Sequence, residues 1–419
     1  MACSSDISKI YECYSDGRKF SSDDETADSS VSYARRYREI MHDATHGLTR
    51  GIIEIDETEN IIVSGPHQPI MDMVLSRRED KTKAELSPNV YIRRVAANQY
   101  SLRDSSSPVI LDIDEGILPW VFCIDKAPNY FTNLLWNLGF LKDENGLLPV
   151  LPFEDELCLE YPRYGSHKHG YGGTYRLAKQ YPQLLRTSLD PIVPCEDTLE
   201  LPLSSINEIA LSDAMHNRRS CRDHSTPPAA LEDVMTLLFL SAHGESSGKG
   251  VQNEPLYRFP YPSGGSLGEL RFLVIANRMT LGGAETGETC FEYHPLSNII
   301  YKHHVNKKAL HSLIRLYSHM PGIPPEELQC LIIVLADAGK VAGKYECVAP
   351  SLIYKHVGAW MQTAYLVSTQ LPLSVCALGG GPADVLPRLF GLEDSFLRPV
   401  GEMVCSRRRD DDFDNSSCS

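Results

Sequence analysis

Arg218-Arg219-Ser220-Cys221-Arg222 is the first of a series of motifs in the C-terminal half of this 419-residue chain. Side chains alternate between the two faces of an extended segment, so Arg218, Ser220 and Arg222 would point the same way and Arg219 would point elsewhere. Two guanidinium groups and a hydroxyl on one face could hold a phosphate through charge-assisted hydrogen bonds. A basic run alone is more often a solvated loop, so its meaning depends on the motifs that follow it.

The series continues with predicted elements in a fixed order. Pro227 to His243 predicts an amphipathic helix, and Leu270 to Ile275 predicts a strand. The loop Pro262-Ser263-Gly264-Gly265 precedes that strand. Phe291 to Ile300 then predicts a hairpin.

Two short motifs belong to the last part of the series. Leu331 to Ala336 predicts a buried strand, and Ser351 to Gln370 predicts a core helix that is apolar almost all round. The pair Lys344-Tyr345 lies between them, and Ala377-Leu378-Gly379-Gly380-Gly381 follows the helix. A Lys-Tyr pair arises by chance about once in a chain of this length, so its position matters more than its composition.

In this order the motifs resemble those of the FMN-dependent nitroreductase superfamily. Within it they resemble the SagB-type (McbC-like) dehydrogenases, which oxidise azoline rings in ribosomally made peptides. The likeness runs from about Leu203 to Arg408, and the segment from Phe291 to Ile300 is similar to one characteristic of the SagB-type group. The helical segment from Val357 to Leu366 keeps four residues of the family's pattern in register: Gly358, Gln362, Tyr365 and Leu366.

The chain also departs from the family's pattern at four positions. His224 stands where Phe or Tyr is usual, and His294 stands where Asp is common. His356 stands where Glu is usual, and Ala359 stands where the family has His. These departures indicate that the surroundings of the site differ from those of typical members.

The resemblance implies an α+β chain. The expected fold is the nitroreductase fold, with a central, mostly antiparallel sheet flanked by helices, preceded by a small winged-helix-like or peptide-clamp domain. It also implies bound FMN. The residues that the resemblance assigns to FMN binding are Arg218, Arg219, Ser220, Arg222, Pro262, Ser263, Gly264, Gly265, Gln362, Leu378, Gly379, Gly380, Arg407 and Arg408. Backbone N–H groups of Leu378 to Gly380 would face the flavin ring, and Pro262 to Gly265 would reach it from the second subunit of a homodimer.

Lys344 and Tyr345 are the catalytic residues that the resemblance implies. Conversion of an azoline to an azole removes one hydride and one proton, and a flavin takes only the hydride, so a base is needed. Both side chains have reference pKa values of about 10, and placing them together beside a flavin could lower one of them. The sequence leaves open which of the two takes the proton. Oxygen is the implied electron acceptor.

The chain divides into five predicted parts. Residues 1–32 and 409–419 are expected to be disordered tails, because they are rich in polar residues and poor in large apolar ones. Residues 33–150 form the winged-helix-like or peptide-clamp domain, with helices expected at Ala34 to Met41 and at Tyr130 to Leu141. Residues 151–204 are rich in proline and are interpreted as a linker, although their tyrosines could instead line a substrate channel. Residues 205–408 form the FMN domain.

Composition excludes several classes of protein. A net charge of -15 argues against nucleic-acid binding, which needs a basic face. The longest apolar runs are far shorter than the roughly 20 residues that a membrane span needs, and the start of the chain is not a secretory signal. We therefore expect a cytoplasmic protein. The twelve cysteines are scattered, and His167 and His169 have no nearby carboxylate, so no metal site is predicted.

The function expected from the resemblance is oxidation of azoline rings in a peptide or peptide-like substrate, with a cyclodehydratase as a partner enzyme. One alternative is a nitroreductase-fold oxidase or reductase of another small molecule, because a fold hosts many reactions. A second alternative is an inactive, peptide-binding subunit of a maturation complex. Retention of Lys344-Tyr345 and of Arg218, Ser220 and Arg222 argues against this last class.

Overall fold

The structure of the protein is a computed structural model that describes residues 51–55, 61–64, 84–87, 90–104, 109–143, 153–163, 172–193, 195, 197–393 and 395–409. The predicted N-terminal tail, the predicted helix from Ala34 to Met41, His167 with His169, and residues 410–419 lie outside these ranges. The N-terminal and C-terminal sheets are described separately below.

The N-terminal part contains a five-stranded sheet in the order β2-β1-β6-β5-β4, in which β1 and β6 are parallel and the other neighbours antiparallel. Its strands are β1 (Gly51–Ile55), β2 (Ile61–Ser64), β4 (Tyr91–Ala96), β5 (Gln99–Arg103) and β6 (Val109–Asp114). A second, two-stranded sheet pairs β3 (Ala84–Leu86) with β7 (Leu141–Asp143). The helical elements are η1 (Glu115–Ile117), α4 (Leu118–Phe122), η2 (Ile124–Lys126), α5 (Asn129–Asn137) and α6 (Phe153–Glu160).

The predicted helix from Tyr130 to Leu141 corresponds to α5, which is shorter. It ends at Asn137, because Gly139 has a φ of 81° and Leu141 already belongs to β7. The apolar stripe that predicted this helix is buried as expected. Its members are Phe131, Leu134, Leu135, Leu138 and Phe140. The peptide-clamp role of this part stays a prediction.

The C-terminal part is built on a seven-stranded sheet in the order β18-β19-β17-β12-β15-β16-β8, and every neighbouring pair in it is antiparallel. The strands are β8 (Asp197–Leu199), β12 (Leu270–Ala276), β15 (Thr289–His294), β16 (Ile299–His303), β17 (Cys330–Asp337), β18 (Leu373–Ala377) and β19 (Leu397–Arg407). The strand predicted at Leu331 to Ala336 and the predicted hairpin from Phe291 to Ile300 are both present. The edge strand β8 comes from the stretch that the sequence predicts as a linker.

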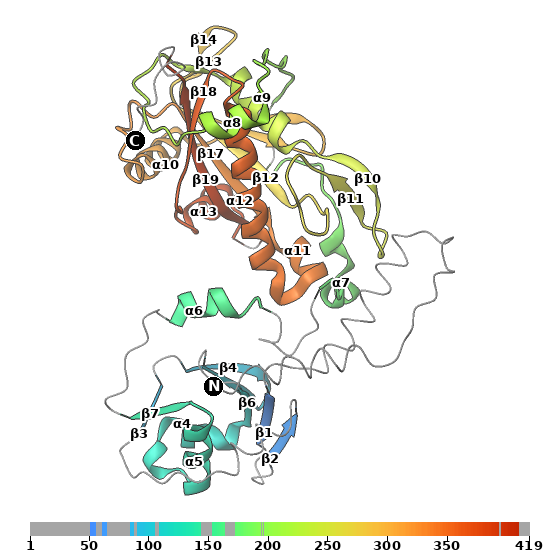
Figure 1. Cartoon of the computed structure of the whole chain (residues 1–419), viewed down its shortest axis with the longest axis vertical. Helices are drawn as coiled ribbons and strands as arrows, with labels where there is room; N and C mark the ends of the chain where they lie inside the picture. The colour runs from blue at the N-terminus through green and yellow to red at the C-terminus, as the bar shows by residue number, and fades with distance from the viewer. Residues whose placement is uncertain are drawn as a thin grey trace. The chain divides into compact units, whose positions relative to one another are not determined.

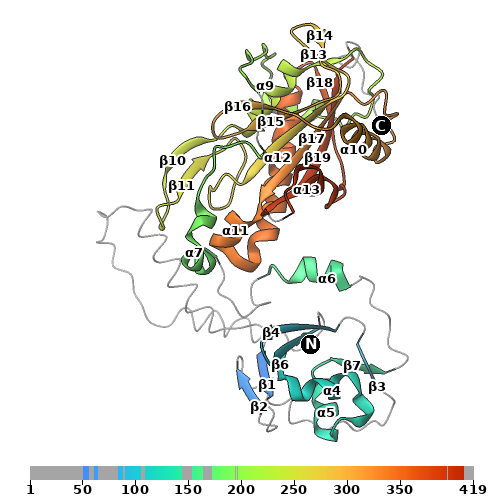
Figure 2. The ribbon, with the colours of Figure 1, turned by 180° about the vertical axis from the view of Figure 1, so that it is seen from behind.

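Helices cover both faces of this sheet (Figures 1 and 2). Along β12, Phe272 and Val274 pack with α9 (Leu231–Ala242) and α12 (Ala349–Ser368), whereas Leu273 and Ile275 pack on the other face with α10 (Lys307–His319) and α13 (Val385–Phe390). This alternation follows from the two-residue period of a strand. The α+β arrangement of an antiparallel sheet flanked by helices is the one that the sequence predicted.

The helix predicted from Pro227 to His243 begins only at Leu231, because the two residues before it form the short strand β9 (Ala229–Ala230), paired with β13 (Met279–Leu281). The remaining elements are α7 (Arg176–Gln180), η3 (Pro182–Leu185), α8 (Leu211–Asn217), β10 (Glu245–Lys249), β11 (Pro255–Arg258), β14 (Ala284–Glu285), α11 (Ala338–Tyr345) and η4 (Glu346–Val348). None of the helices in the described ranges combines the length and the apolar character that a membrane-spanning segment requires.

Candidate active site

Lys344 and Tyr345 are the last two residues of α11, and Lys344 points into a buried polar cluster. Its Nζ donates hydrogen bonds to Oε1 of Glu254 and to the carbonyl of Gly265, each at 3.3 Å. The same Nζ lies 5.3 Å from the ring centroid of Tyr175 and 5.7 Å from that of Tyr345. The predicted pair therefore meets a carboxylate, a carbonyl and two aromatic rings.

Glu254 is the centre of this cluster, and its side chain is fully buried. The Tyr175 hydroxyl donates to its Oε1 at 2.6 Å, and the backbone N–H of Gln252 donates to its Oε2 at 2.8 Å. Burial works to raise the pKa of Glu254, but these hydrogen bonds and the Lys344 charge bring the pKa below its ordinary value. Burial lowers the pKa of Lys344, and Glu254 opposes that shift.

The predicted loop Pro262 to Gly265 lies against this pair in the same chain. Gly265 has a φ of +84°, and a Cβ there would lie 2.7 Å from the Tyr345 ring. Glycine is needed for both reasons, because its backbone tolerates this φ and leaves room for the phenol. The sequence placed this loop at the flavin of a second subunit; its contact with Tyr345 of its own chain was not foreseen.

His356 of α12 holds the same loop through a hydrogen bond. Its Nε2 accepts a hydrogen bond from the Gly264 amide at 2.7 Å, and its Nδ1 donates to Oε1 of Glu269 at 2.5 Å. Because a neutral imidazole has one donor and one acceptor nitrogen, both partners are satisfied by a single tautomer. His356 and Glu269 are both buried.

Two of the predicted phosphate-binding residues, Arg218 and Ser220, lie near the C-terminal end of α12. The Ser220 hydroxyl lies 2.9 Å from the Tyr365 hydroxyl, and the Arg218 guanidinium lies 5.3 Å from the centroid of the same ring. Arg219 turns away and donates to the carbonyls of His216 and Arg218, as the alternation predicted. Arg222 is exposed.

Among the other residues predicted to bind the cofactor, some are exposed to solvent and one is held in hydrogen bonds to the protein. Gln362 and Arg407 are exposed. The Arg408 guanidinium donates to three carbonyls at the end of α12 and the start of β18, those of Ser368, Thr369 and Leu373. Arg408 therefore caps the C-terminal end of that helix by donating to its carbonyls.

The glycine-rich turn after β18 is only partly open. The Leu378 amide already donates to the Glu402 carbonyl at 2.9 Å, which extends the pairing of β18 with β19. Around Gly379 and Gly380, a Cβ would meet nothing within 4 Å. Of the backbone segment expected to face the flavin ring, Gly379 and Gly380 are therefore the part that remains open.

Residues 215–405 match the Nitroreductase family. Their antiparallel sheet flanked by helices is the nitroreductase fold. A protein of Methanocaldococcus jannaschii that is named as a nitroreductase is 24% identical to this chain over 212 residues, which make up 50% of this chain and 98% of that protein.

Solved structures similar to the chain include other proteins named as nitroreductases. One from Anabaena variabilis shares 14% identity and a TM-score of 0.42 over 64% of this chain, which spans only 50% of that protein. A chain of the Escherichia coli microcin synthetase McbBCD complex with truncated pro-MccB17 bound shares 18% identity and a TM-score of 0.36, over 56% of this chain and 93% of that one. A protein of Desulfovibrio desulfuricans in complex with FMN shares 18% identity and a TM-score of 0.32, over 51% and 92%.

The domain that contains the matched residues carries the charges that a phosphate-bearing cofactor requires. No carboxylate in the described ranges lies within ion-pair distance of Arg218 or Arg222, so both guanidinium groups are available to an anion. The turn at Gly379 and Gly380 leaves room for a flat ring to approach the backbone. The residues present therefore fit FMN.

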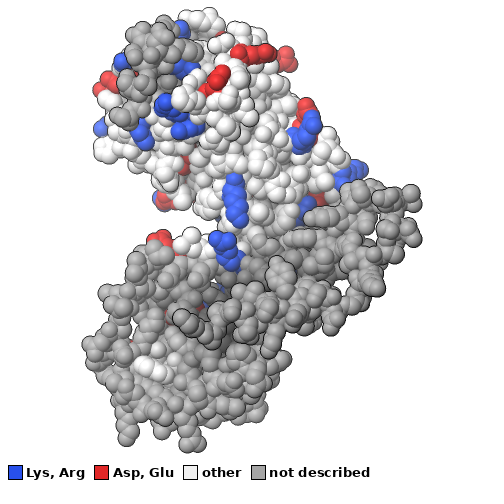
Figure 3. Space-filling view, in the orientation of Figure 1, with Lys and Arg blue, Asp and Glu red and all other residues white. Residues whose placement is uncertain are grey.

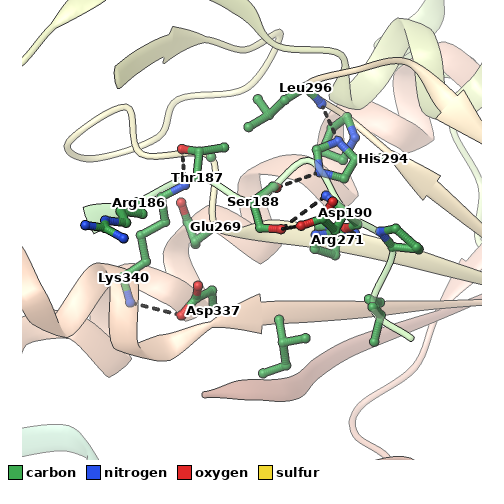
Figure 4. Close-up of a pocket in the computed structure, with 15 residues that line it drawn as sticks. Arg186, Thr187, Ser188, Asp190, Glu269, Arg271, His294, Leu296, Asp337 and Lys340 are labelled. Carbon is green, nitrogen blue, oxygen red and sulfur yellow. Dashed lines mark hydrogen bonds between the residues drawn. The ribbon is translucent and has the colours of Figure 1, made fainter. Parts of the chain in front are cut away.

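A polar pocket of about 200 Å³ adjoins the candidate site through Glu269 (Figure 4). Lys340 of α11 projects into it and donates to the Thr187 hydroxyl at 2.9 Å, and burial lowers the pKa of Lys340 to about 8. Lys344 and Tyr345 do not line this pocket. Its wall mixes three cationic with three acidic side chains and so selects no ligand by charge: Arg186, Arg271, Lys340, Asp190, Glu269 and Asp337.

Three residues of the site were not predicted as site residues from the sequence. Glu254 and Glu269 belong to no motif, and nothing in the sequence marks them. Tyr175 carried a weak signal, because it lies beside Gly172-Gly173 in the tyrosine-rich stretch that could line a substrate channel. Its φ of 54°, rare for a residue with a side chain, also marks it in the structure.

Proposed function

We propose that the protein is an FMN-dependent dehydrogenase that oxidises thiazoline or oxazoline rings of a peptide or peptide-like substrate to azoles. The observation that carries the proposal is the contact of Lys344 and Tyr345 with the Gly264-Gly265 loop. This contact joins the two motifs by which the sequence resembles the SagB-type dehydrogenases. It places a potential base at the loop that the resemblance assigns to the flavin.

FMN would be held through its phosphate by Arg218, Ser220 and Arg222, and its ring would lie against the turn at Gly379 and Gly380. Bound flavin supplies the acceptor for the hydride that leaves the azoline ring. The protein must supply the base for the proton that leaves with it, and Lys344 and Tyr345 are the candidates. Lys344 is buried and Tyr345 is half-buried, and limited access of water strengthens the electrostatic interactions of Lys344 with nearby groups.

We also propose that the active form is a homodimer. The phosphate-binding group and the Lys344-Tyr345 group lie near Tyr365 and His356, which are nine residues apart on α12 and therefore separated by about 13 Å along the axis. A second copy would bring the loop and the catalytic pair of one subunit to the flavin held by the other. Apolar side chains exposed on α8 support this assembly: Leu211 is 63% exposed and Met215 is 58% exposed.

The face of the molecule drawn in Figure 3 is not broadly basic in the part that the structure describes. On that face the described Lys and Arg side chains lie in separate groups, some of them beside Asp or Glu side chains.

The proposal is tested by mixing the purified protein with a synthetic thiazoline peptide under nitrogen. The protein is expected to be yellow from FMN, and the substrate is expected to bleach it, with thiazole formed in equal amount. An oxazoline and a saturated thiazolidine peptide serve as second substrate and control. A preparation that stays colourless with excess FMN contradicts the cofactor; a yellow protein that neither azoline bleaches contradicts the substrate class and favours another small molecule.

A further inference from the structure

Lys344 is held in a position that defines its charge. Its side chain is 11% exposed and faces the Glu254 carboxylate, whose side chain is 0% exposed. It also donates to the Gly265 carbonyl, and its Nζ faces the rings of Tyr175 and Tyr345. Every one of these neighbours favours a cation: the carboxylate by charge, the carbonyl as an acceptor, and the two rings through their negative faces.

We infer that Glu254 and Tyr175 hold Lys344 as an ammonium ion, so that Tyr345 is the residue that accepts the proton from the azoline ring. The inference rests on the proposed function and assigns roles within it. Glu254 and Tyr175 are then positioning residues, because they act through Lys344. Tyr175 comes from the stretch between the two sheets, which makes that stretch part of the site.

The energetic reason lies in Glu254. A carboxylate buried without a cation is strongly unfavourable, and removing one partner of a buried pair leaves an uncompensated charge. Hydrogen bonds from Tyr175 and the backbone N–H of Gln252 keep Glu254 ionised. Burial favours the neutral amine of Lys344, but the ionised carboxylate at 3.3 Å favours the ammonium.

Two other charged or titratable groups that the structure describes near Lys344 are engaged with other partners. Glu346 follows Tyr345 in the chain, but its carboxylate accepts from Arg176 at 2.8 Å and from the Thr174 hydroxyl. On α12, His356 is engaged with Gly264 and Glu269. Glu254 is therefore the carboxylate that sets the charge of Lys344.

The reaction balances with these roles. Two C–H bonds of the azoline break and a double bond forms in the ring. FMN would supply the acceptor for one hydrogen, which leaves as hydride with two electrons, and the other hydrogen would leave as a proton to the phenolate oxygen of Tyr345. The ammonium of Lys344, 5.7 Å from the ring centroid of Tyr345, would favour a negative charge on Tyr345, which would later return the proton to solvent.

The test is the pH dependence of flavin reduction by the thiazoline peptide in Glu254→Gln. If Lys344 works as an ammonium, loss of the carboxylate makes it deprotonate more readily, and the alkaline limb of the profile moves down by about 1–3 pH units. If Lys344 works as a neutral base, the acid limb moves down instead, and the inference is overturned. Glu254→Asp should restore the wild-type profile in part. Glu245→Gln, an exposed ion-pair partner of Arg258 on the adjoining β10–β11 ribbon, should leave it unchanged.

A second measurement needs no substrate. In flavin-loaded protein with isotope-labelled lysine, the Cε resonance that disappears in Lys344→Arg reports the charge of Lys344 directly. It should show an ammonium at neutral pH in the wild type and titrate at lower pH in Glu254→Gln. A neutral amine in the wild type at neutral pH would refute the inference. A wild-type enzyme that oxidises no azoline contradicts the proposed function instead, so the two failures are distinguishable.

Discussion

The imidazole of His356 accepts a hydrogen bond from the backbone amide of Gly264 at 2.7 Å. Its other nitrogen donates to Glu269, the residue before β12. Glu269 and His356 together therefore fix the loop that contacts Tyr345. The family usually has Glu at the position of His356. A carboxylate there could also accept from the Gly264 amide, but it would face Glu269 with like charge. His356 and Glu269 therefore form a matched pair.

Replacing His356 by Ala should release the loop without removing the phosphate contacts at the other end of α12. We expect flavin content to stay high while azoline oxidation falls by about a hundredfold, the scale expected for a reacting group displaced by about 1 Å. Flavin absorbance and turnover, measured on the same preparation, check this.

The matched control uses the like-charge argument. His356→Glu alone should be impaired, because two carboxylates would face one another, and His356→Glu combined with Glu269→Gln should recover much of the activity. Full activity in His356→Ala would show that the loop is held by other contacts.

FMN affinity should depend on Arg218 and Arg222 but little on Arg219. Each charge-assisted hydrogen bond is worth about 1.5–3 kcal/mol, so Arg218→Ala or Arg222→Ala should raise the Kd for FMN by about ten- to a hundredfold. Arg219 instead donates to the carbonyls of His216 and Arg218, so Arg219→Ala is the control. Fluorescence titration of the flavin-stripped proteins measures all three. Equal losses of FMN affinity in the three variants would contradict the assignment of Arg218 and Arg222 to phosphate binding.

Local pattern was sufficient to predict much of the fold. The strand at Leu270 to Ile275 and the helix at Ser351 to Gln370 appear as β12 and α12 with ends shifted by one or two residues. Their apolar content and length are properties of neighbouring residues, which the sequence displays directly. The helix expected from Pro227 to His243 was too long, because the pairing of β9 with β13 is a contact between distant segments.

The site could be predicted only where a motif marked it. Glu254 and Tyr175 meet Lys344 across separations of 90 and about 170 positions in the chain, and no local pattern encodes such an approach. Arg408 shows the reverse case. Its charge and its place in the sequence suggested that it binds the FMN phosphate. In the structure its guanidinium instead donates to carbonyls at the end of α12 and the start of β18.

His294 should make the protein less stable in mild acid. Its Nδ1 accepts from the amides of Leu296 and Ser297, its Nε2 donates to the Ser188 carbonyl, and burial lowers its pKa from 6.5 to about 4. The folded state thus binds the proton more weakly than the unfolded state. The stability from neutral His294 is complete above pH 6.5 and is lost as the pH falls toward 4, by at most about 3 kcal/mol.

His294→Asp isolates this contribution, because Asp, the common residue there in the family, can accept from the same two amides. Urea unfolding between neutral and mildly acidic pH should show a smaller loss of stability in the variant than in the wild type. Parallel curves for the two proteins would mean that His294 is not the titrating group. His224 is also buried with a pKa lowered to about 4, so part of the acid sensitivity should remain in His294→Asp.

Dimer formation should depend on the exposed apolar face of α8. Leu211 and Met215 are one helical turn apart and therefore lie on one side of the helix, where burial against a second copy would remove apolar surface from water. Replacing both by Asp should shift the protein to monomer in sedimentation experiments and weaken flavin retention, because the loop and the catalytic pair would no longer reach a partner's flavin. Leu316, 42% exposed on α10 at the opposite face of the sheet, supplies the control: Leu316→Asp should leave the dimer intact. A wild-type protein that is monomeric and holds its flavin fully would contradict the proposed dimeric site, and dissociation by Leu316→Asp alone would move the interface to the other face of the sheet.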